Sequence, residues 1–414
     1  MSPLLYIPAF AIRLALFHIP AIAETLASRV EIVTPITSYK RLTEGLYLFE
    51  SHVPPYDGGV FHQSPIFLAL FQLLNFLPSI TVPILYALTD ITIAYLLTEI
   101  TTKKQAIYGV KPKLEVEKGA KGIEPWVVGA LYLFNPLSIL SCVSKSTLIF
   151  TNASIVLAVY YALQGEKSLG MFWVAMASYL SFYPAMLVAP IILIILNWGA
   201  NGSTILKKDI VLHCVLLYAT WLAALLFLSY QLVGSWDFMG ATYGVIIFLS
   251  DLTPNVGLFW YFFIEMFDQF RPFFLVVFQL HAFIFAAPLS IKLSEHPIFV
   301  TFMLCGIMGI FKSYPSIGDA ALYLAFLPIH DELLKYMRYG FLTANLFLYA
   351  STLGPIFWHL WIYAGSGNAN FFYAITLVYN IGQILLLVDV MYAMLRRSFD
   401  VEHPESLGKE VVQK

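Results

Sequence analysis

Residues 357–397 read FWHLWIYAGSGNANFFYAITLVYNIGQILLLVDVMYAMLRR, two apolar runs on either side of a short polar turn. A helix needs ~20 mostly apolar residues to span the hydrocarbon core of a bilayer. The runs extend over 340–364 and 371–395, and the polar residues between them suffice only for a tight connection. This stretch therefore predicts two antiparallel transmembrane helices.

The rest of the chain has the same character. Of its 414 residues, 59% are hydrophobic and 12% are charged, and the mean hydropathy is +0.77. A soluble protein carries about 25% charged residues, so a cytosolic enzyme, a secreted module and a disordered chain are excluded. Further apolar runs lie at 3–23, 64–100, 124–143, 146–163, 169–198, 209–233, 244–264, 272–292, 297–311 and 313–329. We predict an all-α polytopic membrane protein with about 10–12 transmembrane helices.

The net charge, the cysteines and the histidines indicate no further function. The net charge of −2 favours no nucleic acid partner. Cys142, Cys214 and Cys305 each sit in an apolar run, where a thiol behaves as a small hydrophobe. His52 and His62 share one polar loop, but two histidines without a third ligand rarely bind zinc. We therefore predict no disulfide, no metal site and no cofactor.

Lysine and arginine predict the orientation, because they favour the cytosolic side. They gather in 101–123, at Lys207 and Lys208, at Lys292 and at Arg396 and Arg397. We expect one membrane domain, 1–397, with 24–63 luminal and 101–123 cytosolic, and a cytosolic polar tail, 398–414. Only one of the two runs within 64–100 can then cross, so the other dips in. Arg13 interrupts the first run, which we expect to be retained, with an interior acid or carbonyl as the partner of Arg13.

The long loop after the first helix is the place where this chain could hold a catalytic carboxylate. Tyr39, Leu42 and Leu46 have helical spacing and predict an amphipathic helix over 37–50 at the membrane surface. A loop of this kind resembles that of GT-C-type glycosyltransferases, which need carboxylates there for metal binding or base catalysis. The candidates are Glu31, Glu44, Glu50 and Asp57, and no two are adjacent. We interpret them as solvated or turn residues.

The only Asp-Glu dipeptide, Asp331-Glu332, precedes Lys335 and Arg338. We expect these four charges to pair on a helix surface.

The turn between the last two helices allows two interpretations. Asn368 or Asn370 could cap the helix that follows. Alternatively, the two amides could bind a lipid headgroup, since they offer donors and acceptors without a charge. Trp361 and Phe371 flank the turn, and such rings favour the depth of the headgroups.

Four stretches, 29–65, 134–155, 311–328 and 357–397, resemble the class U subunit of the glycosylphosphatidylinositol (GPI) transamidase. The resemblance implies a GT-C-like fold in the endoplasmic reticulum membrane and a non-catalytic subunit that recognises or presents the GPI lipid. It also implies partner subunits of classes K, T and S, a GPI-anchor-attachment (Gaa-type) subunit, and catalysis by a cysteine-protease-like partner. Asn368, Asn370, Phe371 and Trp361 would then contact the GPI lipid.

An alternative is a dolichol-phosphate-dependent mannosyltransferase of GT-C type, with Glu31 or Asp57 as its base. A transporter would show paired intramembrane charges in corresponding halves, whereas Arg13, Asp90, Glu265 and Asp389 are scattered.

Overall fold

The computed structural model describes residues 5–108, 122–199, 207–407 and 409. Every regular element among these residues is a helix, and no strand forms there. In the described part of the chain, five segments are long and apolar enough to cross a membrane. They are Thr81–Ile107 in α5 (Thr81–Tyr108), α11 (Lys207–Val233), Asp268–Lys292, which contains α15 (Arg271–Phe283) and α16 (Ala286–Lys292), α19 (Gly340–Ile362) and α20 (Ala369–Glu402). The prediction of an all-α polytopic membrane protein is confirmed.

Two further segments have the right composition but are sharply bent. They are α1 (Tyr6–Phe17) with α2 (Pro20–Ala27), bent by 86°, and α6 (Pro125–Leu133) with α7 (Pro136–Val143), bent by 51°. Counting each pair as one span raises the number of candidate spans from 5 to as many as 7. Proline at the first helical position starts α2, α6 and α7, where its missing N–H costs nothing.

The remaining helices are shorter. They are α3 (Tyr39–Glu50), α4 (Pro65–Asn75), α8 (Leu148–Leu163), α9 (Lys167–Ser181), α10 (Val188–Ile194), α12 (Asp237–Met239), α13 (Val245–Phe248), α14 (Phe259–Ile264), α17 (Pro297–Phe311) and α18 (Ile317–Phe326). Short 3-10 turns cover Tyr183–Leu187, Asp268–Phe270, Leu327–Tyr336 and Pro404–Ser406, and π turns cover Ile195–Gly199 and Gly240–Gly244. Several of the shorter helices are apolar, so the predicted count of about 10–12 transmembrane helices stays a prediction.

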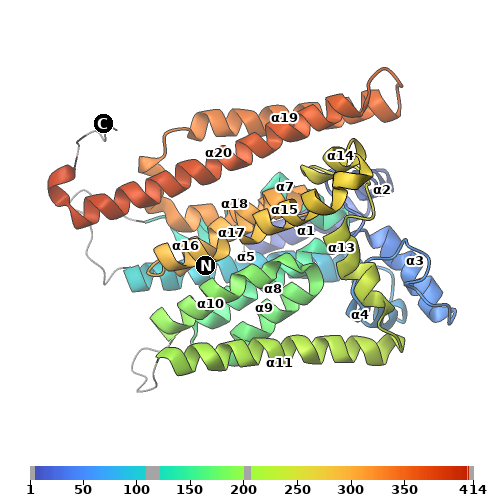
Figure 1. Ribbon diagram of the computed structural model, residues 1–414, viewed down its shortest axis with the longest axis horizontal. Coiled ribbons are helices and arrows are strands. Elements are labelled where there is room, and N and C mark those ends of the chain that lie inside the picture. The colour runs from blue at the N-terminus through green and yellow to red at the C-terminus, as the bar shows by residue number, and fades with distance from the viewer. Residues whose placement is uncertain (1–4, 109–121, 200–206, 408, 410–414) are drawn as a thin grey trace.

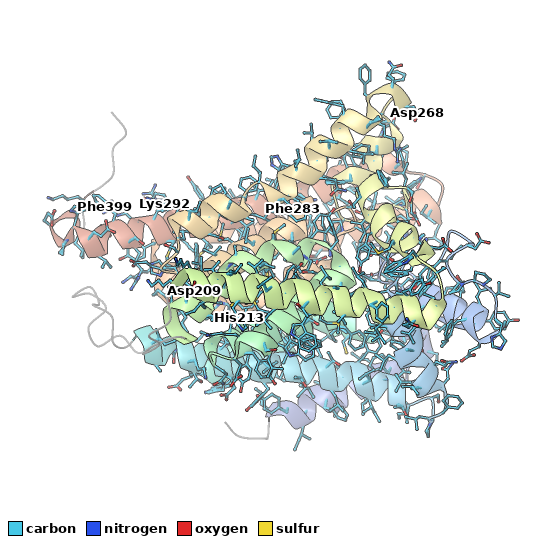
Figure 2. All side chains as sticks on the ribbon, turned by 60° about the horizontal axis from the view of Figure 1, so that its bottom comes forward. Asp209, His213, Asp268, Phe283, Lys292 and Phe399 are labelled. Carbon is cyan, nitrogen blue, oxygen red and sulfur yellow. The ribbon has the colours of Figure 1, made fainter. Side chains whose placement is uncertain are left out.

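Most long helices run side by side along the long axis of the molecule (Figure 1). We call one end of this bundle the α3 end, because α3, α13, α14 and the turn between α19 and α20 lie there (Figure 1). Lys292 and Phe399 lie toward the opposite end, far from Asp268 (Figure 2).

Helix length resolves the two runs within 64–100. The 11 residues of α4 rise about 16 Å at 1.5 Å per residue, too little for a core about 30 Å thick. The 28 residues of α5 are sufficient. The prediction that only one of the two runs crosses is therefore supported.

The predicted span 244–264 is wrong. After α13, Leu249 adopts a left-handed conformation with φ of 49°, and the chain stays irregular until α14. Asn255 Oδ1 accepts a 2.8 Å hydrogen bond from Gly257 N, a local turn that competes with helix. A β-carbon at Gly257 would lie 2.6 Å from the Pro315 ring, so only glycine fits this close approach. Residues 249–258 therefore form a connection at the α3 end.

The expected lysine-rich loop also begins later than predicted. Helix α5 continues to Tyr108, and Lys104 is buried, with its Nζ 2.7 Å from Glu332 Oε1. Asp331 Oδ2 accepts a 2.7 Å hydrogen bond from Ile123 N. The predicted pairing of Asp331-Glu332 with Lys335 and Arg338 is thus wrong, because tertiary partners replace the neighbours in sequence. Residues 109–121 lie outside the described part of the chain.

An ion pair in the core is fully buried. Arg13 and Asp90 form it between α1 and α5, and both are 0% exposed. Arg13 Nη2 also donates to the carbonyl of Leu133 at 3.0 Å, and the Tyr132 hydroxyl donates to Asp90 Oδ1 at 2.6 Å. The expected interior partners of Arg13, an acid and a carbonyl, are both present.

Candidate functional site

The turn between α19 and α20 is closed by its own backbone. The amides of Ser366 and Gly367 both donate to the carbonyl of Leu360 at 3.0 Å. Gly365 has a φ of 61°, in the left-handed region that favours glycine. The Leu360 carbonyl in the last turn of α19 is thereby satisfied, and the turn presents the residues that follow it.

Asn368 is the N-cap of α20. Its Oδ1 accepts hydrogen bonds from Asn370 N at 3.0 Å and Phe371 N at 3.4 Å, so the predicted helix cap is confirmed. Its amide nitrogen donates to no group in the described part of the chain. The cap uses one atom of this exposed side chain and leaves its two N–H donors available.

Asn370 connects α20 to α14. Its Oδ1 accepts a hydrogen bond from the Tyr261 hydroxyl. The Tyr261 ring lies 4.7 Å from the ring of Tyr373, whose hydroxyl donates to the carbonyl of Leu258 at 3.1 Å. Helix α14 and the start of α20 therefore form one polar and aromatic surface at the α3 end.

The two predicted aromatic residues differ in their surroundings. Trp361 stacks on Trp260 with 6.3 Å between ring centroids and 18° between planes, and Trp260 is 1% exposed. Phe371 is 52% exposed and lies 5.9 Å from the Phe357 ring. Trp361 therefore belongs to a packed wall, whereas Phe371 offers an open apolar face.

A pocket of about 330 Å³ lies beside the contact between Tyr261 and Asn370. Six aromatic rings line it, those of Tyr261, Phe262, Phe267, Phe270, Phe274 and Tyr373. Glu265 is the one charged residue of the lining. The first-loop candidates Glu31, Glu44, Glu50 and Asp57 do not line this pocket.

The sequence did not identify Tyr261 as a site residue, because residues 244–264 were assigned to a span. Glu265 and Tyr373 were missed because the contact of α14 with the start of α20 is made only by the fold. A signal was present: five aromatic or apolar residues, FWYFF at 259–263, come shortly before an acid. Aromatic residues gather at the depth of the lipid headgroups, where one side of the ring is apolar and the other is wet.

The candidate carboxylates of the first loop are separated by their partners. Glu31 forms an ion pair with Arg29, with 2.5 Å between Oε1 and Nη2, and Glu50 accepts from Asn75 Nδ2 at 3.1 Å. Asp57 is exposed in a turn, and Glu44 borders a separate pocket beside α3. The described residues hold no group of three or more His, Cys, Asp or Glu side chains that could bind a metal ion.

The predicted amphipathic helix is confirmed as α3. It buries Leu42, Gly45 and Leu46 and leaves Tyr47 exposed. Arg41 joins α3 to the 249–258 connection through an ion pair with Asp251, 2.8 Å between Nη1 and Oδ2.

Two ionisable groups near α3 have fixed charge states. Burial raises the pKa of Asp251, but hydrogen bonds from Thr253 and the Arg41 charge outweigh it, so the pKa is lowered and the carboxylate stays ionised. Burial lowers the pKa of His62, so the ring is neutral at pH 7, and its Nδ1 lies 2.9 Å from the carbonyl of Ala241. The Nδ1 atom of His62 therefore has a polar contact, whereas its Nε2 atom is buried without a hydrogen-bond partner among the described residues.

These features define a class: a polytopic all-α membrane protein with an amide and aromatic binding surface at one end of its helix bundle. Amide donors, ring faces and one unpaired carboxylate are suited to holding a polar ligand by noncovalent contacts. The arrangement supports recognition more directly than bond cleavage.

Comparison with known proteins identifies the family. Residues 7–379 match the family model described as "GPI transamidase subunit PIG-U". The chain is 41% identical over 417 residues to the GPI-anchor transamidase component PIGU of Mus musculus, covering 97% of this chain and 95% of the relative. It is 40% identical over 395 residues to the GPI transamidase component GAB1 of Saccharomyces cerevisiae, covering 94% and 93%. The chain belongs to the PIG-U family of GPI transamidase subunits.

Proposed function

We propose that this chain is a non-catalytic subunit of the GPI transamidase, which recognises or presents the GPI lipid for attachment to the C-terminus of proproteins. The amide and aromatic surface around Asn368 and Asn370 is the observation that carries the proposal. The names of the relatives, all components of a GPI transamidase, support the complex and not a mannosyltransferase.

The chemistry of the surface fits a glycolipid headgroup. The side-chain amide nitrogens of Asn368 and Asn370 offer N–H donors to sugar hydroxyls and phosphate oxygens. Phe371 and Tyr261 offer ring faces beside them. Contacts of this kind orient a sugar without a catalytic group of their own.

The proposed partners are those that the resemblance to the family implies. The chain would assemble with subunits of classes K, T and S and with the Gaa-type subunit, and the cysteine-protease-like partner would carry out the transamidation. The ion pair of Glu31 with Arg29 supports this division of labour, because it engages one of the two residues that a mannosyltransferase would need as its base.

The proposed setting is the endoplasmic reticulum membrane. The α3 end would face the lumen, as the distribution of lysine and arginine predicts. The opposite end, with Lys292 and with Lys207 and Lys208 at the start of α11, would face the cytosol (Figures 1 and 2). Residues 1–397 would form the membrane domain, with 24–63 luminal and 101–123 and 398–414 cytosolic. The helical bundle in Figure 1 supports the single-domain prediction, which was made from the sequence.

A cell-based replacement experiment tests this function. Cells depleted of the protein receive the wild-type chain or a chain with Asn368→Ala and Asn370→Ala, and flow cytometry measures a GPI-anchored surface reporter. We expect attachment to fall about tenfold, the effect of losing one to two net hydrogen bonds of about 1 kcal/mol each. Asn345→Ala, which removes an amide on α19 away from the turn, is the matched control.

The GPI lipids that accumulate in the depleted cells distinguish the transamidase role from the mannosyltransferase role. Complete, fully mannosylated GPI lipids beside uncleaved proproteins support the transamidase role. Lipids that lack a mannose would establish the mannosyltransferase instead. Normal attachment by a normally expressed double variant would contradict the role of the two amides.

A further inference from the structure

Glu265 is an acid without a basic partner at the edge of an apolar pocket. It follows α14, is exposed, and forms no ion pair with any Lys or Arg of the described residues. The nearest arginine in sequence, Arg271, is engaged elsewhere: its Nη2 donates to the carbonyl of Leu249 at 2.8 Å, and its guanidinium lies 5.7 Å from the Phe263 ring. The carboxylate is therefore available to a cation from outside the chain.

The walls of the pocket also favour a cation. Rings from α14, from the turn Asp268–Phe270, from α15 and from α20 converge on it. Within this set Phe262 meets Phe274 at 5.5 Å and 74°, and Tyr261 meets Tyr373 at 4.7 Å and 31°. Aromatic faces carry partial negative charge and attract ammonium groups within about 6 Å.

The negative charge of Glu265 also affects Tyr261. Partial desolvation and the neighbouring Glu265 carboxylate raise the pKa of Tyr261. The Tyr261 hydroxyl also donates to Asn370. One ring thus joins the negative pocket to the amide surface, so a single headgroup can contact both.

An acyl chain is the plain alternative occupant, because most of the lining is apolar. A hydrocarbon tail gains nothing from Glu265, whose desolvation on covering would oppose tail binding. A primary ammonium group gains from both the carboxylate and the rings. The lining therefore favours the cation.

We propose that this pocket binds a primary ammonium group of the GPI headgroup, with Glu265 as its counter-ion and the aromatic rings as its cage. The inference rests on the proposed function and extends it from neutral amide contacts to recognition of charge. Two parts of the GPI lipid carry such an amine, the phosphoethanolamine and the glucosamine. Their shared chemistry is what the pocket selects.

The test uses the purified transamidase complex in maltoside detergent, with binding measured by microscale thermophoresis. The probes are mannose 6-phosphoethanolamine and glucosaminyl-inositol, each compared with its N-acetylated form. We expect the wild-type complex to bind one amine about tenfold more tightly than its acetylated form, as for a cation held over aromatic rings. The probe that shows this preference identifies the source of the amine.

Three variants sharpen the result. Glu265→Gln removes charge and keeps shape, so it should lower the preference for the amine to the smaller part that the rings supply, while leaving the acetylated probe unaffected. Asp268→Asn removes an exposed acid three residues away, which does not line the pocket, and should keep the wild-type preference (Figure 2). Phe267→Leu removes a ring that is 74% exposed and should weaken binding of the amine alone.

The outcomes separate this inference from the proposed function. An unchanged preference in Glu265→Gln, or no preference in the wild-type complex, would overturn the cage. If the Asn368→Ala, Asn370→Ala variant then still weakened the binding of both forms of a probe, the headgroup role of the two amides would hold without the cage. Failure of the complete GPI lipid to bind the complex would contradict both the ammonium pocket and the proposed function.

Discussion

The Arg13–Asp90 pair and the Glu265 pocket both place charge in a largely apolar protein, but their partners differ. Arg13 and Asp90 are completely buried, and each has further hydrogen bonds within the chain. Glu265 is exposed and has only the Tyr261 hydroxyl beside it. Charge that serves folding is fully paired inside the bundle, whereas charge left unpaired at the α3 end is available to a ligand.

Other buried charges follow the pattern of Arg13. Lys312 Nζ donates to Asp319 Oδ1 at 2.6 Å, and Asp319 Oδ2 accepts from Ser316 N at 2.9 Å in a capping box. Asp389 accepts from the backbone amides of Arg338 and Tyr339, each at 2.9 Å. The contrast with Glu265 therefore holds for several helices and can be tested by substitution.

The largest effect should come from breaking the buried pair. Asp90→Leu leaves the Arg13 charge buried without its acid, which costs about 3–5 kcal/mol in the free energy of unfolding. Titration with SDS, followed by intrinsic fluorescence, measures the loss. The double variant Arg13→Leu, Asp90→Leu should recover most of it. A double variant as unstable as Asp90→Leu would contradict the argument from unpaired charge.

A pH effect should come from His330, which is buried beside Lys104. Burial and the Lys104 ammonium lower the pKa of His330 to about 4. An unfolded histidine has a pKa of about 6.5, so between pH 6.5 and 4 only the unfolded chain gains this proton. The free energy of unfolding is therefore highest above pH 6.5 and falls on acidification by up to about 1.4 kcal/mol per pH unit.

His330→Gln provides the control for this pH effect. Glutamine keeps a hydrogen-bond acceptor near Lys104 but does not titrate, so the slope between pH 6.5 and 5 should decrease. The pKa of Glu332 is lowered well below its usual value, despite burial, by Lys104 and His330. The contribution of Glu332 to the free energy of unfolding is lost only at lower pH, so the slope between pH 6.5 and 5 is specific to His330. Equal slopes in wild type and variant would disprove the assignment.

A smaller effect should separate the two uses of Asn368. Asn368→Ala removes the cap of α20 and should cost about 1 kcal/mol, whereas Asn368→Ser keeps a capping oxygen and should cost much less. Both variants lose the amide donors and should lower GPI attachment alike. If Asn368→Ser attaches anchors normally, the residue acts as a cap alone.

The smallest effect is expected at the pocket itself. Glu265→Gln removes a charge that stabilises nothing else in the fold, so the free energy of unfolding should change by less than about 0.5 kcal/mol. The same SDS titration measures it. A large loss of stability would show that Glu265 has a structural partner and would weaken the comparison with Asp90.

Much of the fold could be predicted from local pattern. Apolar runs of sufficient length gave α11, α19 and α20, and apolar positions at helical spacing gave α3. The prediction of one span over 244–264 was wrong because apolar composition does not indicate the turn at Asn255 and Gly257. Lys104 with Glu332 was missed because residues 228 apart in sequence leave no local signal.

The site could be predicted only in part. The amides of the α19–α20 turn stand out in sequence, because they interrupt two apolar runs. Tyr261 and Glu265 do not, since their importance comes from the meeting of α14 with α20, a contact between positions 109 apart in the case of Tyr261 and Asn370. Periodicity identifies one side of such a surface and tertiary packing supplies the other.

The length of α20 has a consequence for the opposite side of the membrane. Its 34 residues rise about 51 Å at 1.5 Å per residue, about 20 Å more than the hydrocarbon is thick. If its first turn lies at headgroup depth with Asn370, its last turns extend beyond the hydrocarbon on the other side, where Arg397 and Asp400 are still buried against the protein. The pair of Arg396 with Asp400, 3.0 Å between Nη2 and Oδ1, then stabilises the part of the helix that lies beyond the hydrocarbon. A fluorophore placed there would report from a defined height above the membrane surface.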